Sequence, residues 1–377
     1  MMRRLLAYAG NTIIGSISYT VRRRATKMDE FARIRHWTAG RHSSEWLDQR
    51  GVIVGIGDDA AVIEPRLELA GLSGPLQWLM AVDTMVETVH FNSMTMEDGD
   101  IGYKALAANI SDIAAMGGVP LHALVSVSVP AAYGPERMRR LYDGLYACAE
   151  QYGVAIIGGD TTSSPLHLVV AVTVTGAVEA GKALRRSGAK PGDAVFLTGP
   201  VGLSAAGLHV LSAPAGEAVR AEAGGLAALV QAHRRPAPSV RAGRLLQARG
   251  TCTSLNDVSD GLASEAAEIA AASHVRLALH EELLPRSGSM AAYAGLCGLS
   301  ALDLMLYGGE DYVLLGTMAA EDAAAAKEAF HQEGLPFFLI GEVEAGEPGV
   351  ELITRKQNGK SLSRARLEAR GYNHFQG

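Results

Sequence analysis

From Phe31 onward, short apolar runs alternate with longer stretches in which apolar residues recur at helical spacing. This alternation is typical of an α/β or α+β protein, in which helices pack on the faces of a sheet. In the first half, the pattern predicts strands over 52–56, 78–82, 123–129, 155–157 and 167–178, and helices over 101–116 and 135–152.

The alternation resumes after a polar connector, 180–193, which contains three glycines and Pro191. Such residues interrupt regular structure, and 377 residues suggest two domains more readily than one. We therefore predict an N-terminal domain over 28–180 and a C-terminal α/β domain over 181–377. The second domain is expected to contain strands over 194–198, 275–279, 312–315 and 337–340, helices over 204–211 and 262–272, and a plain alanine-rich surface helix over 320–330.

The first 27 residues differ from the rest, with five arginines and no acidic residue around a mildly apolar stretch. Asn11, Ser16 and Ser18 make that stretch too polar for a membrane span, and no clear signal-peptide cleavage site follows it. Met28 is a natural start for the folded chain. We expect residues 1–27 to be disordered or to lie outside the fold, and we expect no membrane partner.

Composition narrows the classes of function. Hydrophobic residues make up 48% and charged residues 20%, so each half can bury a substantial core. A formal net charge of -6 and a pI near 6.0 argue against a nucleic-acid-binding surface. Cys148, Cys252 and Cys297 are widely separated and form no CxxC pair, which favours a reducing cytoplasm over a disulfide framework or a zinc site.

Acidic residues recur in short phrases, most of them rich in glycine and several of them following an apolar run. Carboxylates at strand ends, beside backbone that a ligand can approach closely, suit Mg²⁺, which takes a few carboxylates and completes its shell with water and phosphate oxygens. We therefore predict a site for several Mg²⁺ ions and a nucleotide. The phrases contain Asp58 and Asp59, Asp83, Asp112, Asp160, Asp257 and Asp260, and Glu310 and Asp311.

Two familiar nucleotide motifs are only approximated. Residues 55–60 match the loose pattern G-x-G-x-x-A, but the adjacent aspartates would repel a pyrophosphate and Pro65 interrupts a following helix. Residues 176–183 miss a Walker P-loop, because Ala183 occupies the position of the Mg²⁺-binding serine or threonine. If this chain uses ATP, it uses neither cradle.

Several phrases admit two interpretations. Asn109 and Asp112 share one face of an apolar helix, where either a metal or an internal hydrogen-bond pair would satisfy them. Asp260 could bind a metal or cap the helix that follows it. A turn at Gly158 and Gly159 would offer backbone N–H groups to a phosphate.

Read in order, the phrases closely resemble those of the thiamine-monophosphate kinase family, over roughly 28–375. That family belongs to a superfamily with aminoimidazole ribonucleotide synthetase. The resemblance implies a two-domain fold of that type, an N-terminal sheet that pairs with its copy in a homodimer, and a nucleotide between the halves and across the dimer. It implies direct, Mg²⁺-assisted transfer of the ATP γ-phosphate to thiamine monophosphate, giving thiamine diphosphate.

The resemblance also assigns roles to residues, with metal ions rather than a catalytic side chain driving the transfer. Where the family often has Ser-Thr before a metal aspartate, this chain has Ala81-Val82, so any metal contact there must use backbone carbonyls. The implied metal contacts are Asp59, Asp83, Asp112, Asp160, Asp257, Asp260, Ala81 and Val82; the implied ATP contacts are Gly158, Gly159, Arg186, Ser259 and Tyr142; and the implied substrate contacts are His90, Glu310 and Tyr372.

Two other functions compete with this interpretation. One is a sister ATP-dependent synthetase such as the purine-pathway enzyme, and the other is a non-catalytic Mg²⁺–nucleotide sensor. A sensor would be expected to lose some ligand carboxylates, whereas nearly all of them stand in this sequence.

Overall fold

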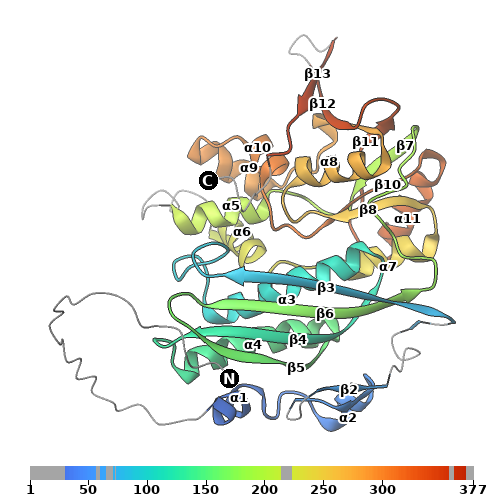
Figure 1. The fold of residues 1–377 in the computed structure, drawn as a ribbon. Helices are drawn as coiled ribbons and strands as arrows, with labels where there is room; N and C mark the ends of the chain where they lie inside the picture. Colours follow the sequence, from blue (N-terminus) through green and yellow to red (C-terminus); the bar gives the residue numbers. More distant parts are fainter. Residues whose placement is uncertain are drawn as a thin grey trace, which may run out of the picture.

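The computed structural model describes residues 30–56, 60–64, 71–72, 74–213, 223–355 and 361–370. The predicted extension 1–27, Asp59 and Tyr372 lie outside these ranges. The described chain forms two halves, one above the other in the view of Figure 1. The lower half contains a four-stranded sheet and the upper half a seven-stranded sheet.

The lower half begins with α1 (Glu30–Thr38), α2 (Ser44–Asp48) and the antiparallel pair β1 (Val52–Val54) and β2 (Val62–Ile63). Its main sheet has the order β3-β6-β4-β5, in which only the β4–β5 pair is parallel. Helix α4 makes the crossover that a parallel pair requires. The elements are β3 (Leu76–Val86), α3 (Asp98–Ala115), β4 (Val119–Pro130), α4 (Pro135–Tyr152), β5 (Ala155–Ser164) and β6 (Val169–Glu179).

Helices α3 and α4 cover one face of this sheet and form the first hydrophobic core with it. The two helices approach very closely, because glycines stand at their contact. A Cβ on Gly144 would lie 1.7 Å from the carbonyl oxygen of Gly99, and a Cβ on Gly102 would lie 1.9 Å from that of Leu141. Only residues without a side chain permit this spacing.

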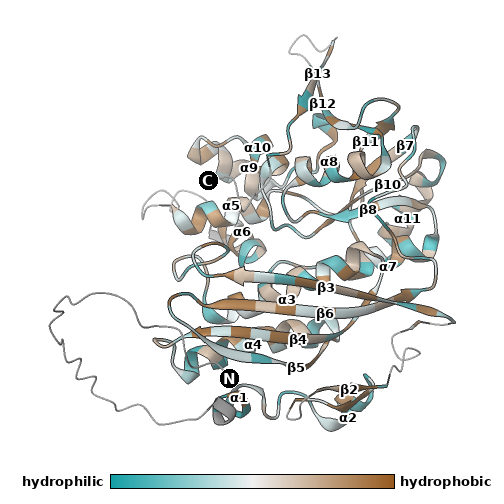
Figure 2. Ribbon diagram, viewed as in Figure 1, coloured by the Kyte–Doolittle hydropathy of each residue, from teal (hydrophilic) through white to brown (hydrophobic). Residues whose placement is uncertain are grey.

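The opposite face of the sheet is open and apolar, as the brown strands in Figure 2 show. Trp78, Met80 and Val82 alternate along β3 on this face and are 45%, 74% and 63% exposed. Leu124 on β4 is 43% exposed. An apolar surface of this kind usually marks an interaction site.

The upper half is built on a mixed sheet with the order β13-β12-β9-β11-β7-β10-β8. Buried side chains form hydrophobic cores on both of its faces. Its strands are β7 (Asp193–Leu197), β8 (Cys252–Asp257), β9 (Arg276–His280), β10 (Leu314–Ala319), β11 (Phe338–Glu344), β12 (Gly349–Arg355) and β13 (Leu362–Leu367). Its α-helices are α5 (Leu203–Ser212), α6 (Ala223–Arg234), α7 (Val240–Arg249), α8 (Leu262–Ser273), α9 (Gly288–Cys297), α10 (Ala301–Tyr307) and α11 (Ala323–Gln332).

The predicted α/β class is confirmed, and α4 has the predicted bounds 135–152. Strands proved longer than their apolar runs, because β3 and β5 continue into polar sequence. The alanine-rich stretch is helical as predicted, with a 3-10 turn over Ala320–Asp322 that leads into α11. It buries Ala326 and Phe330, so it is more than a surface helix. The boundary at residue 180 stays a prediction, since α3 packs on α7 of the upper half as well as on its own sheet.

Within the described ranges, no single helix combines the length and the apolar composition needed to cross a membrane. Among the described helices, the pair α9 and α10 meets those two criteria together, with a bend of 119° at its break.

The close contact between α3 and α4 yields a test. We expect Gly144→Ala to lower the free energy of unfolding by about 2 kcal/mol or more, because the new methyl group forces the helices apart. Gly295 in α9 has nothing within 4 Å of its Cβ position, so Gly295→Ala serves as the control. That substitution should raise the free energy of unfolding by roughly 0.5–1 kcal/mol through helix propensity. Urea denaturation of both variants measures the difference, and equal effects would contradict the packing argument.

Candidate active site

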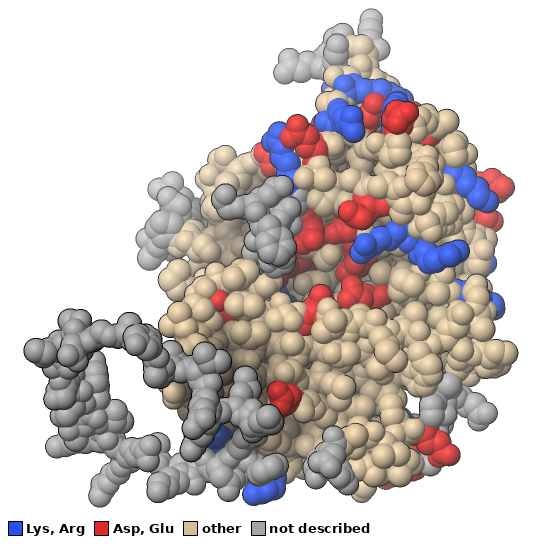
Figure 3. All heavy atoms as spheres, in the orientation of Figure 1, with Lys and Arg blue, Asp and Glu red and all other residues tan. Residues whose placement is uncertain are grey.

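Acidic side chains gather where the two halves meet, as the red atoms near the centre of Figure 3 show. Three of the predicted carboxylates interact there, and each comes from a different element. Asp83 lies on β3, Asp112 on the last turns of α3, and Asp257 at the end of β8. Asp83 therefore stands inside a strand, and the expectation that this aspartate follows a strand end was wrong.

Two buried polar residues of α3 fix this arrangement. Asn109 accepts the Asp83 N–H at 2.8 Å and donates to the Ala105 carbonyl at 2.9 Å, which ties β3 to the helix. Asn109 thus finds its partners on the backbone, and no hydrogen bond to Asp112 is needed to satisfy it. Two positions further on, Ser111 Oγ donates to Asp257 Oδ2 at 2.7 Å and links the helix to the upper half.

The described protein groups compensate the ionised forms of these three carboxylates poorly, so that their pKa values are raised. Burial, followed by the charges of Asp257 and Asp83, raises the pKa of Asp112 to about 8. Burial is also the main cause that raises the pKa of Asp257 to about 6, against the hydrogen bond from Ser111. Burial and the nearby carboxylate of Asp260 raise the pKa of Asp83, while His90 opposes the shift. Such a cluster attracts a cation.

No group of three or more His, Cys, Asp or Glu side chains in the described part of the chain is arranged to hold a metal ion by itself. This geometry still suits Mg²⁺, which binds through one or two carboxylates and fills its shell with water and substrate phosphates. The oxygen-only donors around Asp112 are the type that Mg²⁺ prefers.

The phrase around Asp257 lies beside the phrase that contains Glu310. The Glu310 N–H donates to the Ser259 carbonyl at 2.6 Å, and the Tyr312 N–H donates to the Val258 carbonyl at 2.9 Å. Glu310 has a φ of 63° and Tyr312 a φ of 54°, in the left-handed region that such residues seldom adopt. Strained backbone of this kind is commonly found at functional sites, where the surrounding structure holds it in place. The backbone at Glu310 therefore fixes the direction of its carboxylate.

A buried lysine from the lower half determines where that side chain points. Lys104 on α3 is fully buried, and its Nζ donates to Glu310 Oε2 at 2.7 Å. Burial lowers the pKa of Lys104, while Glu310 opposes the shift. The sequence analysis missed Lys104. The sequence did contain a signal that could have identified it. Lys104 is a charged residue within an apolar helix, and it precedes Ser111 by seven positions, which places both on the same face.

Glu265, also missed, organises the residues around Ser259. Its carboxylate accepts from the Asp260 N–H at 3.0 Å, from Ser259 Oγ at 3.2 Å and from the amide of Asn256. Asn256 Oδ1 in turn accepts from Arg186 Nε at 3.0 Å, and the half-exposed guanidinium lies close enough to lower the pKa of Asp112. Gly261 precedes α8 without a side-chain cap, so the interpretation of Asp260 as a helix cap was wrong.

His90 lies in the loop after β3. Its Nδ1 accepts the Val86 N–H at 3.0 Å, so the neutral ring carries its proton on Nε2. His90 also lowers the pKa of Asp83 against the effect of burial, so the ring lies near the carboxylates.

The phrase Gly158-Gly159-Asp160 is far from this cluster within one chain. These residues are part of β5 and do not form the predicted turn. Gly159 runs so close to β4 that a Cβ would lie 1.8 Å from the Val125 carbonyl oxygen. Strands β6 and β4 separate β5 from β3, a spacing of about 14 Å at about 4.8 Å per strand. The predicted ligands therefore form two separate groups within one chain, one around Asp83, Asp112 and Asp257 and the other around Asp160.

A cavity of about 490 Å³ lies between α1, α2, α4 and the residues after β1, and it reaches β5 at Ile156. Gly55 and Ile56, which immediately precede the Asp58-Asp59 phrase, line it together with Ile156, Tyr146 and His42. Tyr142, a predicted ATP contact, is only 5% exposed and stacks on Trp37. Its ring is covered by α1, so its assignment stays a prediction.

Comparison with known proteins agrees with this architecture. The family model described as AIR synthase related protein, N-terminal domain, matches residues 57–178. The model described as AIR synthase related protein, C-terminal domain, matches residues 190–353. The chain is therefore an AIR synthase related protein. The acidic cluster lies where its two mixed α/β halves meet.

Individual relatives narrow the class. The thiamine-monophosphate kinase of Bacillus subtilis (strain 168) is 40% identical over 351 residues, which cover 92% of this chain and 100% of that protein. The crystal structure of the thiamine-monophosphate kinase from Stenotrophomonas maltophilia K279a is 35% identical with a TM-score of 0.72, covering 81% of this chain and 92% of that one. AaThiL complexed with AMPPCP and TMP is 29% identical with a TM-score of 0.67, covering 95% and 100%. The chain belongs to the thiamine-monophosphate kinase family.

The Lys104–Glu310 pair can be tested by stability. We expect Lys104→Met to lower the free energy of unfolding by about 2 kcal/mol, because it leaves a partly buried carboxylate without its charged donor. Lys327→Met on the exposed face of α11 is the matched control and should change it by less than about 0.5 kcal/mol. Chemical denaturation measures both, and a Lys104→Met variant as stable as the control would show that the pair is energetically neutral.

Proposed function

We propose that this chain transfers the γ-phosphate of ATP to thiamine monophosphate, giving thiamine diphosphate and ADP. Thiamine-monophosphate kinases are its relatives over most of their length, and AaThiL has been observed with AMPPCP and TMP. The observation that carries the proposal is the meeting of Asp83, Asp112 and Asp257 from three elements at one cleft. Phosphoryl transfer needs such positioning and charge compensation more than a covalent catalyst.

Mg²⁺ bound by these aspartates would neutralise charge on the phosphates during the transfer. The chain's own part is to hold the aspartates in place. Asn109 orients the Asp83 backbone and Ser111 orients the Asp257 carboxylate. If the carbonyls of Ala81 or Val82 contribute, they can do so because β3 is an edge strand with unpaired backbone groups.

The acceptor needs little activation. A phosphate oxygen of thiamine monophosphate, already ionised at neutral pH, attacks the γ-phosphorus, and the bond to the bridging oxygen breaks as ADP leaves with the electron pair. No strong general base is required. In the proposal Asp260 stands beside the metal aspartates, and Ser259 and Arg186 contact the polyphosphate, for which a guanidinium is well suited.

The substrate contacts proposed for His90 and Glu310 follow from charge. In the proposal His90, whose ring is oriented by the hydrogen bond between Nδ1 and the Val86 N–H, contacts the phosphate of thiamine monophosphate. Glu310 offers a carboxylate to the cationic thiazolium or the aminopyrimidine. Tyr372 remains a proposed contact that lies outside the described residues.

We also propose that the working unit is a homodimer joined through the open apolar face of the four-stranded sheet. Trp78, Met80 and Val82 would be buried there by a second copy. A symmetric pairing can bring the partner's β5 toward the cleft of the first copy, and so unite the two groups of predicted ligands. Gly158, Gly159 and Asp160 would then face the nucleotide from the partner, with its adenine in the cavity beside Ile156.

A cytoplasmic location is part of the proposal. Its support is that Cys148, Cys252 and Cys297 are all free thiols.

The activity is tested by incubating purified protein with ATP, Mg²⁺ and thiamine monophosphate and measuring thiamine diphosphate and ADP. We expect both products in equal amounts, and we expect Asp112→Asn to lower kcat roughly 10²-fold or more by removing a charge from the phosphate site. Glu328→Gln, on the exposed side of α11, is the control and should leave kcat unchanged. Absence of both products would reject the kinase, and normal activity and Mg²⁺ dependence of Asp112→Asn would reject the metal scaffold.

The shared site is tested by mixing two inactive variants, Asp112→Asn and Asp160→Asn, under conditions that exchange subunits. Mixed dimers would have one cleft in which both aspartates are native. We therefore expect recovery of about one quarter of wild-type activity when half of the dimers are mixed. A cleft built from a single chain would give no recovery of activity. If native mass spectrometry showed the wild-type protein to be a monomer, the proposed dimer would be rejected.

A further inference from the structure

The C-terminal end of α6 contacts both elements that carry the proposed substrate contacts. His233, Arg234 and the following residue, Arg235, stand at this end. His233 lies toward Glu310, with its Nδ1 3.4 Å from Oε2 of that carboxylate and 3.1 Å from Ser204 Oγ. Burial lowers the pKa of His233 to about 4, so this ring is a neutral hydrogen-bonding group.

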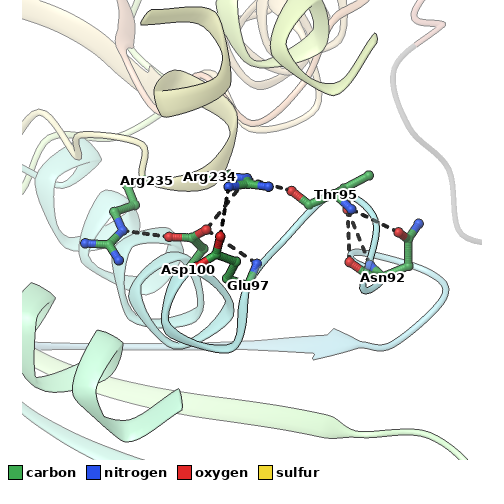
Figure 4. A network of polar contacts seen from close by, with 6 residues as sticks. All are labelled: Asn92, Thr95, Glu97, Asp100, Arg234 and Arg235. Atoms are coloured by element: carbon green, nitrogen blue, oxygen red, sulfur yellow. Dashed lines mark hydrogen bonds and ion pairs between the residues drawn. The ribbon is translucent and has the colours of Figure 1, made fainter. Parts of the chain in front are cut away.

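The neighbouring Arg234 reaches the loop that carries His90. Its Nε donates to the Thr95 carbonyl at 2.9 Å, and its guanidinium also lies 3.7 Å from carboxylate oxygens of Asp100 and of Glu97 (Figure 4). The Thr95 segment is itself closed by hydrogen bonds from the backbone of Thr95 to Asn92. Arg234 therefore anchors the end of this hydrogen-bonded loop, at Thr95, to α6.

The other end of the same loop is anchored within the lower half. Glu87 accepts from the Leu168 N–H at 2.9 Å and from the hydroxyl of Tyr133. Between the two anchors, Thr88 adopts a φ of 70°, in the left-handed region. His90 lies between these two anchors and is also held to Val86 by its own backbone and ring hydrogen bonds. Arg234 therefore acts on His90 through the loop that carries it.

We propose that Arg234 is a positioning residue for the thiamine-phosphate substrate, which sets the separation between His90 in the lower half and Glu310 in the upper half. This inference rests on the proposed function of those two residues. One short segment of α6 touches Glu310 through His233 and the His90 loop through Arg234, so it acts as a spacer between them. A substrate held at its phosphate end and at its ring end is sensitive to that spacing.

Arginine suits this role because its planar fork can contact a carbonyl and a carboxylate at once in a fixed geometry. Arg235 provides a comparison within the same helix end. Its Nε donates to Asp100 Oδ1 at 2.7 Å, so it shares the carboxylate with Arg234, and its guanidinium lies over the ring of Tyr103 on α3. Removing either arginine takes one cation from Asp100, and only Arg234 bonds to the loop backbone.

The test compares Arg234→Ala, Arg235→Ala and Arg234→Lys in steady-state kinetics with both substrates and in binding titrations with thiamine monophosphate. For Arg234→Ala we expect KM and Kd for thiamine monophosphate to rise about tenfold, with KM for ATP within about twofold of wild type. Arg235→Ala should leave all three values within about twofold. Arg234→Lys keeps the charge without the fork and should fall between wild type and Arg234→Ala.

A thermal melt of each variant separates misfolding from misplacement. The inference is overturned if Arg234→Ala raises KM for both substrates alike, or if Arg234→Ala and Arg235→Ala weaken thiamine monophosphate equally. If Arg234→Ala fails to fold, Arg234→Lys decides between the same outcomes. A wild-type protein that binds thiamine monophosphate and transfers no phosphate would refute the proposed function and still test the spacer through Kd, whereas a wild type that does neither would refute both.

Discussion

The site depends on the burial of polar side chains along α3. A helix enclosed on both sides can keep such groups only where each finds a partner, since an unpaired polar group in the interior is costly. Lys104, Asn109 and Ser111 find theirs on three separate segments: the phrase of Glu310, the backbone of β3 and the end of β8. The same requirement that satisfies the helix therefore assembles the cleft around Asp112.

Much of this fold is readable from the sequence because most elements have a clear hydrophobic period. Helix α4 combines a Pro start, an apolar face and Gly153 in a left-handed C-cap, and its bounds were predicted correctly. Strands β3 and β5 were shortened in the prediction, because polar residues, beginning at Asp83 in β3 and at Asp160 in β5, interrupt their apolar runs. The alternation of apolar and polar residues reflects which positions are buried. A strand that extends beyond the core to carry functional groups therefore loses the sequence pattern by which it could be predicted.

The site was predictable at the level of residue types and less so at the level of partners. Glycine-flanked acidic residues are visible in the sequence, but their partners are not marked by any motif. Lys104 reaches Glu310 across 206 positions, and Glu265 binds the Asp260 N–H from the next helix. The roles of Asp83, Asp112, Asp160, Asp257 and Asp260 remain proposals. What no pattern in one sequence could reveal is that Asp160 lies on a strand far from Asp83, because sheet order is set by long-range pairing.

The hydrogen bond from Ser111 to Asp257 has a consequence for motion. It is buried and joins the two halves beside the carboxylates, and the fully buried Lys104 makes a second such joint nearby. A hinge that swung the halves apart would have to break both bonds and expose their partners without replacement. Opening of the cleft by rigid rotation of the two halves is therefore disfavoured. Ligands are expected to enter and leave through movement of peripheral segments, while the contacts between the halves at Ser111 and Lys104 persist.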